Sequence, residues 1–91
     1  MAYRFKVGQQ FKNTSLSCSH IIRTVTKFRG KKGKRIFFKV DEFIHESPQH
    51  ERHIVREENY HIYGDFAGNE YIKLWEYKGD TACIYADVYE K

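Results

Sequence analysis

Large apolar residues fall at every second position in several stretches of the chain, and this spacing predicts β-strands. The clearest stretch covers residues 35–44, where the apolar positions are Ile36, Phe38, Val40 and Ile44. A period of two places such side chains on one face of a pleated strand, so that this face is buried and the other meets solvent. Residues 20–28 form a second strand of this kind. Glycines interrupt residues 29–34 between the two strands, which predicts a hairpin with an exposed tip.

The beginning of the chain carries a weaker form of the same pattern. Tyr3, Phe5 and Val7 alternate with charged residues, and a glycine then interrupts the alternation. Because a glycine inside a strand pattern is typical of a bend or bulge, we expect a short first strand that bends before Phe11.

The second half of the chain predicts three more strands, at about residues 59–63, 70–78 and 81–89. In the last of them one face is apolar and consists of Ala82, Ile84, Ala86 and Val88. The sequence Lys78-Gly79-Asp80-Thr81 precedes this strand and matches a compact hairpin turn, because two central residues that include a glycine are typical of tight β-hairpins.

One segment favours a helix instead. Ser47 can cap free backbone amides, and Pro48 suits the first helical position because it has no amide hydrogen to leave unsatisfied. The residues that follow offer few apolar anchors. We therefore expect at most one short helix near residues 48–57, lying on the surface, with an irregular loop as the alternative.

Composition supports a mainly β fold in a single domain, residues 1–91. Ile, Val, Phe, Tyr and Trp together number 28, whereas Leu and Ala together number 6. Branched and aromatic side chains favour strands, and Leu and Ala favour helices. Five or six short antiparallel strands commonly curl to protect their edges. We predict a small antiparallel barrel or a strongly curled sheet of SH3-like or OB-like size, with an open sheet carrying one helix as the alternative.

No segment resembles a targeting or membrane-spanning sequence. A membrane helix needs roughly 18 consecutive apolar residues, and no apolar run in the chain approaches that length. The first twelve residues alternate charges with aromatic rings and lack the apolar core of a signal peptide. We expect a cytoplasmic protein that is a monomer or a weak homodimer.

Charge divides the chain into two halves. Residues 1–40 carry eleven Lys and Arg and no Asp or Glu, whereas residues 41–91 carry all twelve acids and five cations. Six cations fall inside nine residues at the predicted hairpin tip, and they are Lys27, Arg29, Lys31, Lys32, Lys34 and Arg35. Like charges at this density repel one another unless an anion neutralises them. We predict that this block binds an anionic partner.

Nucleic acid is the partner that the block fits best. Phosphates repeat along a strand, so a ribbon with cations at its tip and stems can contact several at once. Six such contacts would give a slope of log affinity against log salt of about −5 on duplex DNA and about −4 on single strands. Because the block contains more Lys than Arg, we expect little sequence specificity. DNA, RNA, a nucleoprotein complex and an acidic protein surface all remain candidates.

Aromatic residues offer a second surface. Most of the rings are expected in the core, but a possible interface consists of Trp75, Tyr77, Tyr85 and Tyr89. Such rings stack on unpaired bases, and they also anchor protein interfaces. The alternative function is therefore a small phage or mobile-element inhibitor or accessory protein that binds a larger host protein or a ribonucleoprotein.

Metal and catalytic sites are weakly indicated. Four histidines lie within seventeen residues, and they are His45, His50, His53 and His61. A helix would place His50 and His53 one turn apart, but two ligands do not complete a zinc site. Together with Arg56, Glu57, Glu58 and Tyr60 they form a conceivable acid/base centre for metal-independent RNA cleavage. No catalytic motif is present, so we expect no enzyme activity, no metal and no cofactor.

Overall fold

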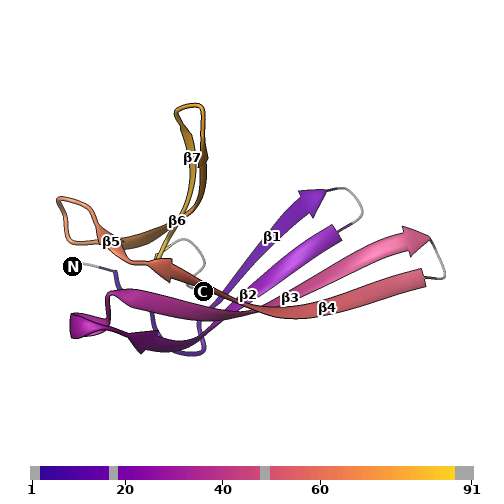
Figure 1. Ribbon diagram of the computed structural model, residues 1–91, viewed down its shortest axis with the longest axis horizontal. Helices are drawn as coiled ribbons and strands as arrows, with labels where there is room; N and C mark the ends of the chain where they lie inside the picture. The colour runs from indigo at the N-terminus through magenta and orange to yellow at the C-terminus, as the bar shows by residue number, and fades with distance from the viewer. Residues whose placement is uncertain (1–2, 17–18, 48–49, 88–91) are drawn as a thin grey trace.

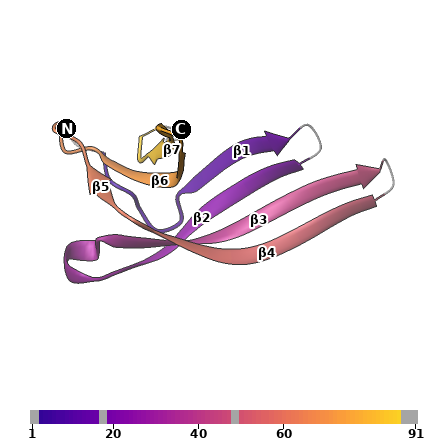
Figure 2. The same cartoon turned by 45° about the horizontal axis from the view of Figure 1, so that its top comes forward.

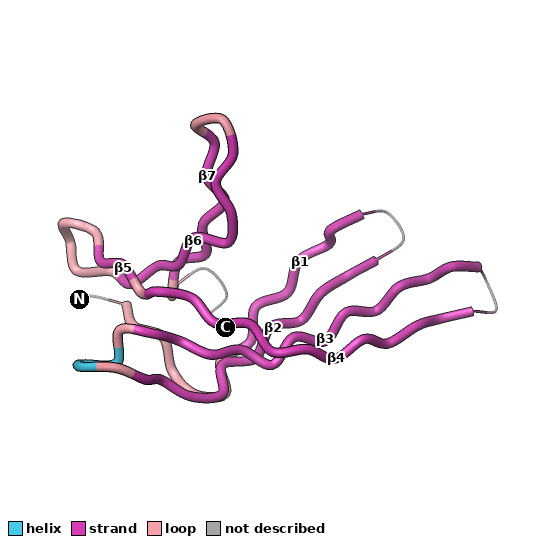
Figure 3. Tube along the Cα trace, in the orientation of Figure 1, coloured by secondary structure: helices cyan, strands magenta, loops and turns pink. Residues whose placement is uncertain are grey.

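The computed structural model describes residues 3–16, 19–47 and 50–87, and within these ranges all side chains except those of residues 14–16, 32, 46 and 47. It is an antiparallel β protein (Figure 1 and Figure 3). The strands are β1 (Gln10–Leu16), β2 (Ser19–Arg29), β3 (Arg35–Ser47), β4 (His50–His61), β5 (Tyr63–Gly64), β6 (Glu70–Tyr77) and β7 (Asp80–Tyr85). Among the described residues the only helical segment is a 3-10 turn, Lys31–Gly33, between β2 and β3.

The strands form two sheets. One has four strands in the order β1-β2-β3-β4, and the other has three in the order β5-β6-β7. In both sheets each strand pairs antiparallel with its neighbour in the chain. The mainly β prediction is confirmed. The described strands do not close into one barrel, and the far ends of the four-stranded sheet extend away from the three-stranded sheet (Figure 1 and Figure 2).

Alternation explains which face of the four-stranded sheet is buried. Val25, Phe38 and Glu58 are aligned across β2, β3 and β4, and directly opposed residues share a face. On this face Val25, Ile36, Phe38 and Val40 are almost completely buried. The residues between them face solvent, as the period of two predicts.

A single apolar core joins the two sheets. Its buried members are Phe5, Phe11, Ile21, Val25, Ile36, Phe38, Val40, Ile72, Ile84 and Ala86. Rings meet edge to face inside it, with the Phe11 and Phe38 centroids 6.2 Å apart. Burial of these rings and branched side chains is the main driving force that holds the three-stranded sheet against the long one.

The N-terminal segment also connects the sheets, although it is not the strand that we expected. Residues 3–9 lie outside any strand, and the first strand begins at Gln10. Tyr3 accepts a hydrogen bond from the Glu70 amide at 2.9 Å, and the Phe5 amide donates to Glu70 Oε1 at 2.9 Å. Gly8 donates to Val25 at 2.9 Å. The backbone of this segment therefore forms hydrogen bonds with both β6 and β2 and connects the two sheets.

The predicted helix near residues 48–57 is wrong, because β4 occupies His50–His61. β4 pairs with β3 over nearly its whole length, from the Arg35–His61 pair to the Ser47–His50 pair. Pro48, which suggested the helix start, lies outside the described residues. The predicted strand at 59–63 is therefore divided between the end of β4 and the short β5.

The last hairpin forms where it was predicted, although β7 ends at Tyr85 and residues 86–87 of the predicted strand form a turn. β6 and β7 pair antiparallel, with Tyr77 opposite Asp80 and only Lys78 and Gly79 between them. Both turn residues have positive φ, 49° and 84°. That conformation is typical of the tight turns whose twist matches two antiparallel strands. Ile84 and Ala86 of the predicted apolar face are buried, and Val88 lies outside the described residues.

Candidate nucleic-acid interface

The basic block lies at the β2–β3 hairpin, as the sequence predicted. β2 ends at Arg29, the 3-10 turn follows, and β3 begins at Arg35. The Gly33 amide donates to the Gly30 carbonyl at 3.2 Å, and the Ile62 amide donates to the Lys34 carbonyl at 2.7 Å. These bonds fix the turn and tie it to the segment between β4 and β5. The cations are therefore held on an ordered ribbon.

Where the structure describes the cationic side chains of this ribbon, none of them pairs with a described acid. Among the described side chains, no carboxylate lies within ion-pair distance of Lys27, Arg29, Lys31, Lys34 or Arg35. The side chain of Lys32 is outside the described set. The Arg35 guanidinium donates to Asn59 Oδ1 at 2.8 Å, which leaves its charge without a counter-ion. The ribbon thus presents concentrated positive charge to solvent.

Two of these cations rest on an aromatic ring. Lys27 Nζ lies 4.9 Å from the centroid of the Phe37 ring, and Arg29 Cζ lies 5.8 Å from it. A bulge in β2 after Val25 brings Lys27 opposite Phe37. Cation–π attraction restrains long side chains without removing their charge. Contact with Phe37 therefore restrains the side chains of Lys27 and Arg29 on the solvent face of the sheet.

A column of tyrosine rings crosses the three-stranded sheet. Tyr63, Tyr71 and Tyr85 are directly opposed in β5, β6 and β7. The rings of Tyr63 and Tyr71 are stacked with centroids 5.5 Å apart, and those of Tyr71 and Tyr85 are stacked at 4.9 Å. The column lies on the face opposite Ile72 and Ile84, which are core residues. It is half-exposed, and Tyr63 is the most exposed of its three members.

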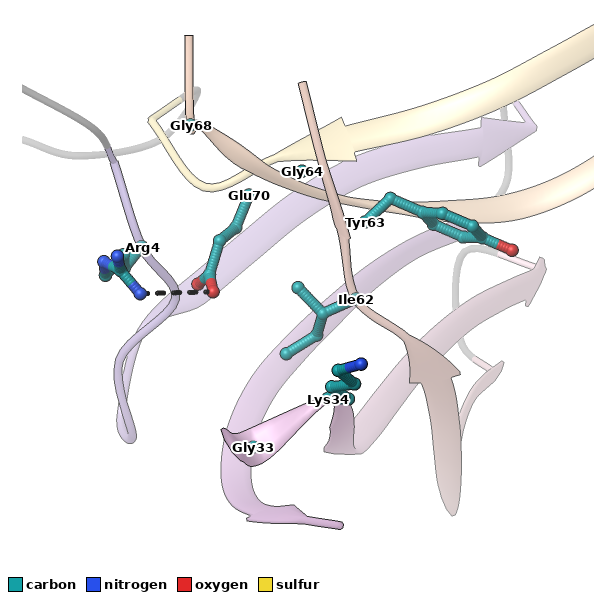
Figure 4. Close-up of a pocket in the computed structure, with 8 residues that line it drawn as sticks. All are labelled: Arg4, Gly33, Lys34, Ile62, Tyr63, Gly64, Gly68 and Glu70. Atoms are coloured by element: carbon teal, nitrogen blue, oxygen red, sulfur yellow. Dashed lines mark ion pairs between the residues drawn. The ribbon is translucent and has the colours of Figure 1, made fainter. Parts of the chain in front are cut away.

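A small pocket connects the basic ribbon with this column. It has a volume of about 160 Å³, and its lining residues are Arg4, Gly33, Lys34, Ile62, Tyr63, Gly64, Gly68 and Glu70. Figure 4 shows Lys34 and Ile62 on one side and the Arg4–Glu70 ion pair, at 3.9 Å, on the other. Lys34 and Tyr63 thus belong to one continuous surface.

The predicted aromatic interface is divided between two faces. Tyr85 belongs to the column, whereas a bulge in β6 places Trp75 opposite Ala82, on the other face of the hairpin. Trp75 and Tyr77 are 57% and 64% exposed, so both rings lie largely in solvent. Tyr89 lies outside the described residues. The structure does not bring these four rings together.

A network of charges covers the core face of the long sheet beyond the apolar residues. Arg23, which is buried, donates to Glu58 Oε1 at 3.0 Å and to Asn13 Oδ1 at 3.0 Å. Arg56 donates to the other oxygen of Glu58 at 3.2 Å. Separate bonds join Arg56 to Glu42 at 2.7 Å and the Tyr60 hydroxyl to Glu58 Oε1 at 2.5 Å. Of the residues considered above for RNA cleavage, this network contains Arg56, Glu58 and Tyr60.

The network holds its groups in fixed protonation states. Burial raises the pKa of Glu58, but hydrogen bonds from Tyr60 and Arg23 outweigh it, so the pKa is lowered overall. Burial and the bond to Glu58 raise the pKa of Tyr60 to about 12. A carboxylate that stays ionised and a phenol that stays protonated are poor partners for proton transfer near neutral pH. This geometry is typical of a structural network.

Tyr60 makes the stability of the fold sensitive to alkali. Its folded pKa of about 12 exceeds the ordinary value of 10.0, so the folded chain keeps a proton that the unfolded chain loses between these values. We expect this contribution to be complete below pH about 10 and to disappear as the pH rises towards about 12, with a loss on the order of 1 kcal/mol after allowance for solvent screening. Urea unfolding on both sides of pH about 10 measures it.

The matched variant for this measurement is Tyr60→Phe. It removes the titrating hydroxyl but keeps the ring against Phe38, whose centroid lies 5.9 Å away. The alkaline decline of the wild type should be steeper than that of the variant. Equal declines would show that Tyr60 does not carry the effect.

The histidines occupy different positions on the long sheet. His53 stacks on Phe43 with centroids 4.4 Å apart, and its Nε2 lies 2.8 Å from Asp41 Oδ1. His45 Nδ1 lies 3.9 Å from Glu51 Oε2, and the rings of His61 and Tyr63 meet edge to face with centroids 4.7 Å apart. Since β4 is a strand, His50 and His53 point to opposite faces. Within the described ranges no group of three or more His, Cys, Asp or Glu side chains is placed to hold a metal ion.

Sequence reasoning missed three residues of this surface. Tyr63 and Tyr71 were assigned to the core with most other rings, and Arg4 received no role. The register of β5, β6 and β7 reveals the column, because it aligns residues that are far apart in sequence. A pattern of exposed Tyr at alternate positions in neighbouring strands is the signal that could have indicated it.

Comparison of the chain with protein-family models, with curated proteins and with solved structures gives no match. The part of the chain that the structure describes contains no helix with the length and apolar character needed to cross a bilayer. The chemistry of the exposed side chains is therefore the basis for assigning a function.

Proposed function

We propose that this chain is a small cytoplasmic nucleic-acid-binding module that contacts phosphates with the basic hairpin of residues 27–35. The observation that carries the proposal is the set of described cations on that hairpin, none of which has a described acidic partner. Folding gains little from bringing like charges together, so their density favours an external anion. Affinity then comes mainly from phosphate contacts and counter-ion release, with little sequence specificity.

The shape of the hairpin supports contact with several phosphates. Cations stand on both stems and at the turn, and the ribbon lies at one end of the molecule (Figure 1). Two antiparallel strands form a thin element that can enter a groove or follow a single strand. The proposed role is binding without catalysis, because the groups nearest to an acid/base centre are locked in the Arg23–Glu58 network.

The salt dependence of binding tests the proposal. Labelled duplex and single-stranded DNA should bind the wild type with slopes of about −5 and −4, which means a roughly thousandfold loss on duplex between about 50 and 200 mM salt. The variant Arg29→Ala/Lys31→Ala/Lys34→Ala loses three of these contacts. Its slope on duplex should be shallower by about 2.7.

A control variant removes the same charge elsewhere. Lys12→Ala/Lys39→Ala/Lys78→Ala takes cations from β1, β3 and the β6–β7 turn, away from the hairpin. Its slope should stay close to that of the wild type. The proposal fails if the control loses as much slope as the hairpin variant, or if neither DNA binds the wild type at about 50 mM salt.

Exposed rings favour a second candidate function. Phe66 is fully exposed, in a loop that Asp65 fixes by accepting hydrogen bonds from the amides of Ala67 and Asn69, each at 2.9 Å. With Trp75 and Tyr77 it offers rigid aromatic anchors of the kind found at protein interfaces. The candidate is an inhibitor or accessory protein of a phage or mobile element that docks on a host protein or ribonucleoprotein. Absence of binding to both oligonucleotides would favour it.

A further inference from the structure

Tyr63 belongs to the tyrosine column and lines the same pocket as Lys34 of the basic hairpin. It is the end ring of the column, since β5 is an edge strand of its sheet. Lys73 Nζ lies 4.7 Å from the centroid of the Tyr63 ring, and Tyr63 is 36% exposed. Part of the ring is therefore accessible to a ligand, beside the Lys73 ammonium and the His61 ring, whose centroid lies 4.7 Å away.

The two ends of the column differ in charge. Around Tyr63 lie the cations Lys73 and Lys34, and Arg4 lies across the pocket. Asp87 comes two residues after Tyr85 at the other end, whereas Asp65 comes two residues after Tyr63 and its carboxylate accepts hydrogen bonds from the amides of Ala67 and Asn69. A ligand that carries phosphate is therefore attracted more strongly to the Tyr63 end than to the Tyr85 end.

The pocket beside Tyr63 can admit a sugar-phosphate backbone. Gly33, Gly64 and Gly68 leave its wall without side chains at three positions, so a ligand can approach the protein backbone closely. Lys34 has no acidic partner among the described residues, whereas Arg4 is engaged by Glu70 at 3.9 Å. Lys34 is consequently the cation of the pocket that is free to bind a phosphate.

We propose that the Tyr63 end of the column and the adjoining pocket bind one nucleotide of a single strand, with its phosphate on Lys34 and Lys73 and its base stacked on Tyr63. This inference rests on the proposed function and deepens it. An unpaired base can turn outward and stack on an aromatic ring, whereas the faces of a paired base are covered by its neighbours. Duplex nucleic acid therefore contacts the basic hairpin but cannot stack a base on Tyr63.

Substitution of Tyr63 separates the two kinds of contact. Base stacking on an aromatic side chain contributes about 1–3 kcal/mol by alanine substitution, so Tyr63→Ala should weaken binding of a single-stranded oligonucleotide about 5- to 150-fold. Its affinity for duplex of the same length should not change. Because the ring neutralises no phosphate, the salt slope on the single strand should also stay the same.

Two variants serve as controls in the same titrations. Tyr63→Phe keeps the ring, and its affinity for the single strand should remain within about twofold of the wild type. Tyr77→Ala removes a ring that is more exposed than Tyr63, 64% against 36%, on the other face of the β6–β7 hairpin, and it should have no effect. Lys73→Ala should weaken single-strand binding and make its slope shallower by about 0.7.

The results distinguish this inference from the proposed function. If Tyr63→Ala weakens duplex and single-strand binding equally, or weakens neither, the inference is overturned while the hairpin proposal stands on its own salt slopes. A loss with Tyr77→Ala in place of Tyr63→Ala would place the ring contact on the opposite face and overturn it as well. Failure of the wild type to bind either oligonucleotide would overturn both.

Discussion

Replacing Glu58 with alanine is expected to lower the free energy of unfolding by about 3–5 kcal/mol, because it leaves a buried guanidinium without its counter-charge. The side chain of Arg23 is 8% exposed, and its Nε lies 3.0 Å from Glu58. After the substitution only the neutral Asn13 would remain as its described partner, at 3.0 Å. Arg56 would keep Glu42, at 2.7 Å. The main loss is therefore the desolvated charge of Arg23.

Urea unfolding monitored by circular dichroism measures this loss as a lower midpoint with an unchanged slope. Glu57→Ala is the matched control, since it removes an adjacent carboxylate on the solvent face of β4 and should change stability by less than about 0.5 kcal/mol. Removing both buried charges with Arg23→Met/Glu58→Leu should cost less than Glu58→Ala alone. A cost below about 1 kcal/mol for Glu58→Ala would show that water reaches Arg23 and solvates it.

This network also explains why the sequence predicted the β4 region poorly. The inward residues of β4 are Ile54, Arg56, Glu58 and Tyr60. Two of the four are charged, so the strand lacks the apolar alternation that revealed β3 and β7. Their charges are matched by Arg23 and Glu42 on other strands, and such partners become visible only when the strands are paired. Because polar residues hid the β pattern of this strand, the helix-start signal at Ser47 and Pro48 led to the prediction of a helix.

The candidate surface was also only partly predictable from the sequence. Charge density located the hairpin, because six neighbouring cations and two glycines form a local signal. The link between Lys34 and Tyr63 was not predictable, since it depends on the backbone bond from the Ile62 amide to the Lys34 carbonyl. Trp75 and Tyr85 lie on opposite faces because β6 has a bulge between Lys73 and Trp75. One extra residue in a strand moves the side chains that follow it to the other face.

Two neighbouring phenylalanines should respond very differently to substitution. Phe38 in β3 is completely buried, and its ring centroid lies 6.2 Å from that of Phe11 and 5.9 Å from that of Tyr60. Phe38→Ala is expected to lower the free energy of unfolding by about 3–5 kcal/mol, from lost burial and the cavity that remains. Domains of this size have about 5–15 kcal/mol in total, so this variant should be close to unfolding at room temperature.

Phe37→Ala supplies the internal comparison, because the same atoms are removed one residue away on the solvent face. Its ring is half-exposed and supports Lys27 and Arg29 at 4.9 and 5.8 Å. We expect a loss of stability below about 1.5 kcal/mol, since little apolar area returns to water. Thermal and urea unfolding of both variants decides the matter. If Phe38→Ala lowers the free energy of unfolding no more than Phe37→Ala does, the core does not lie between the two sheets. The two sheets would then not hold the basic hairpin next to the tyrosine column.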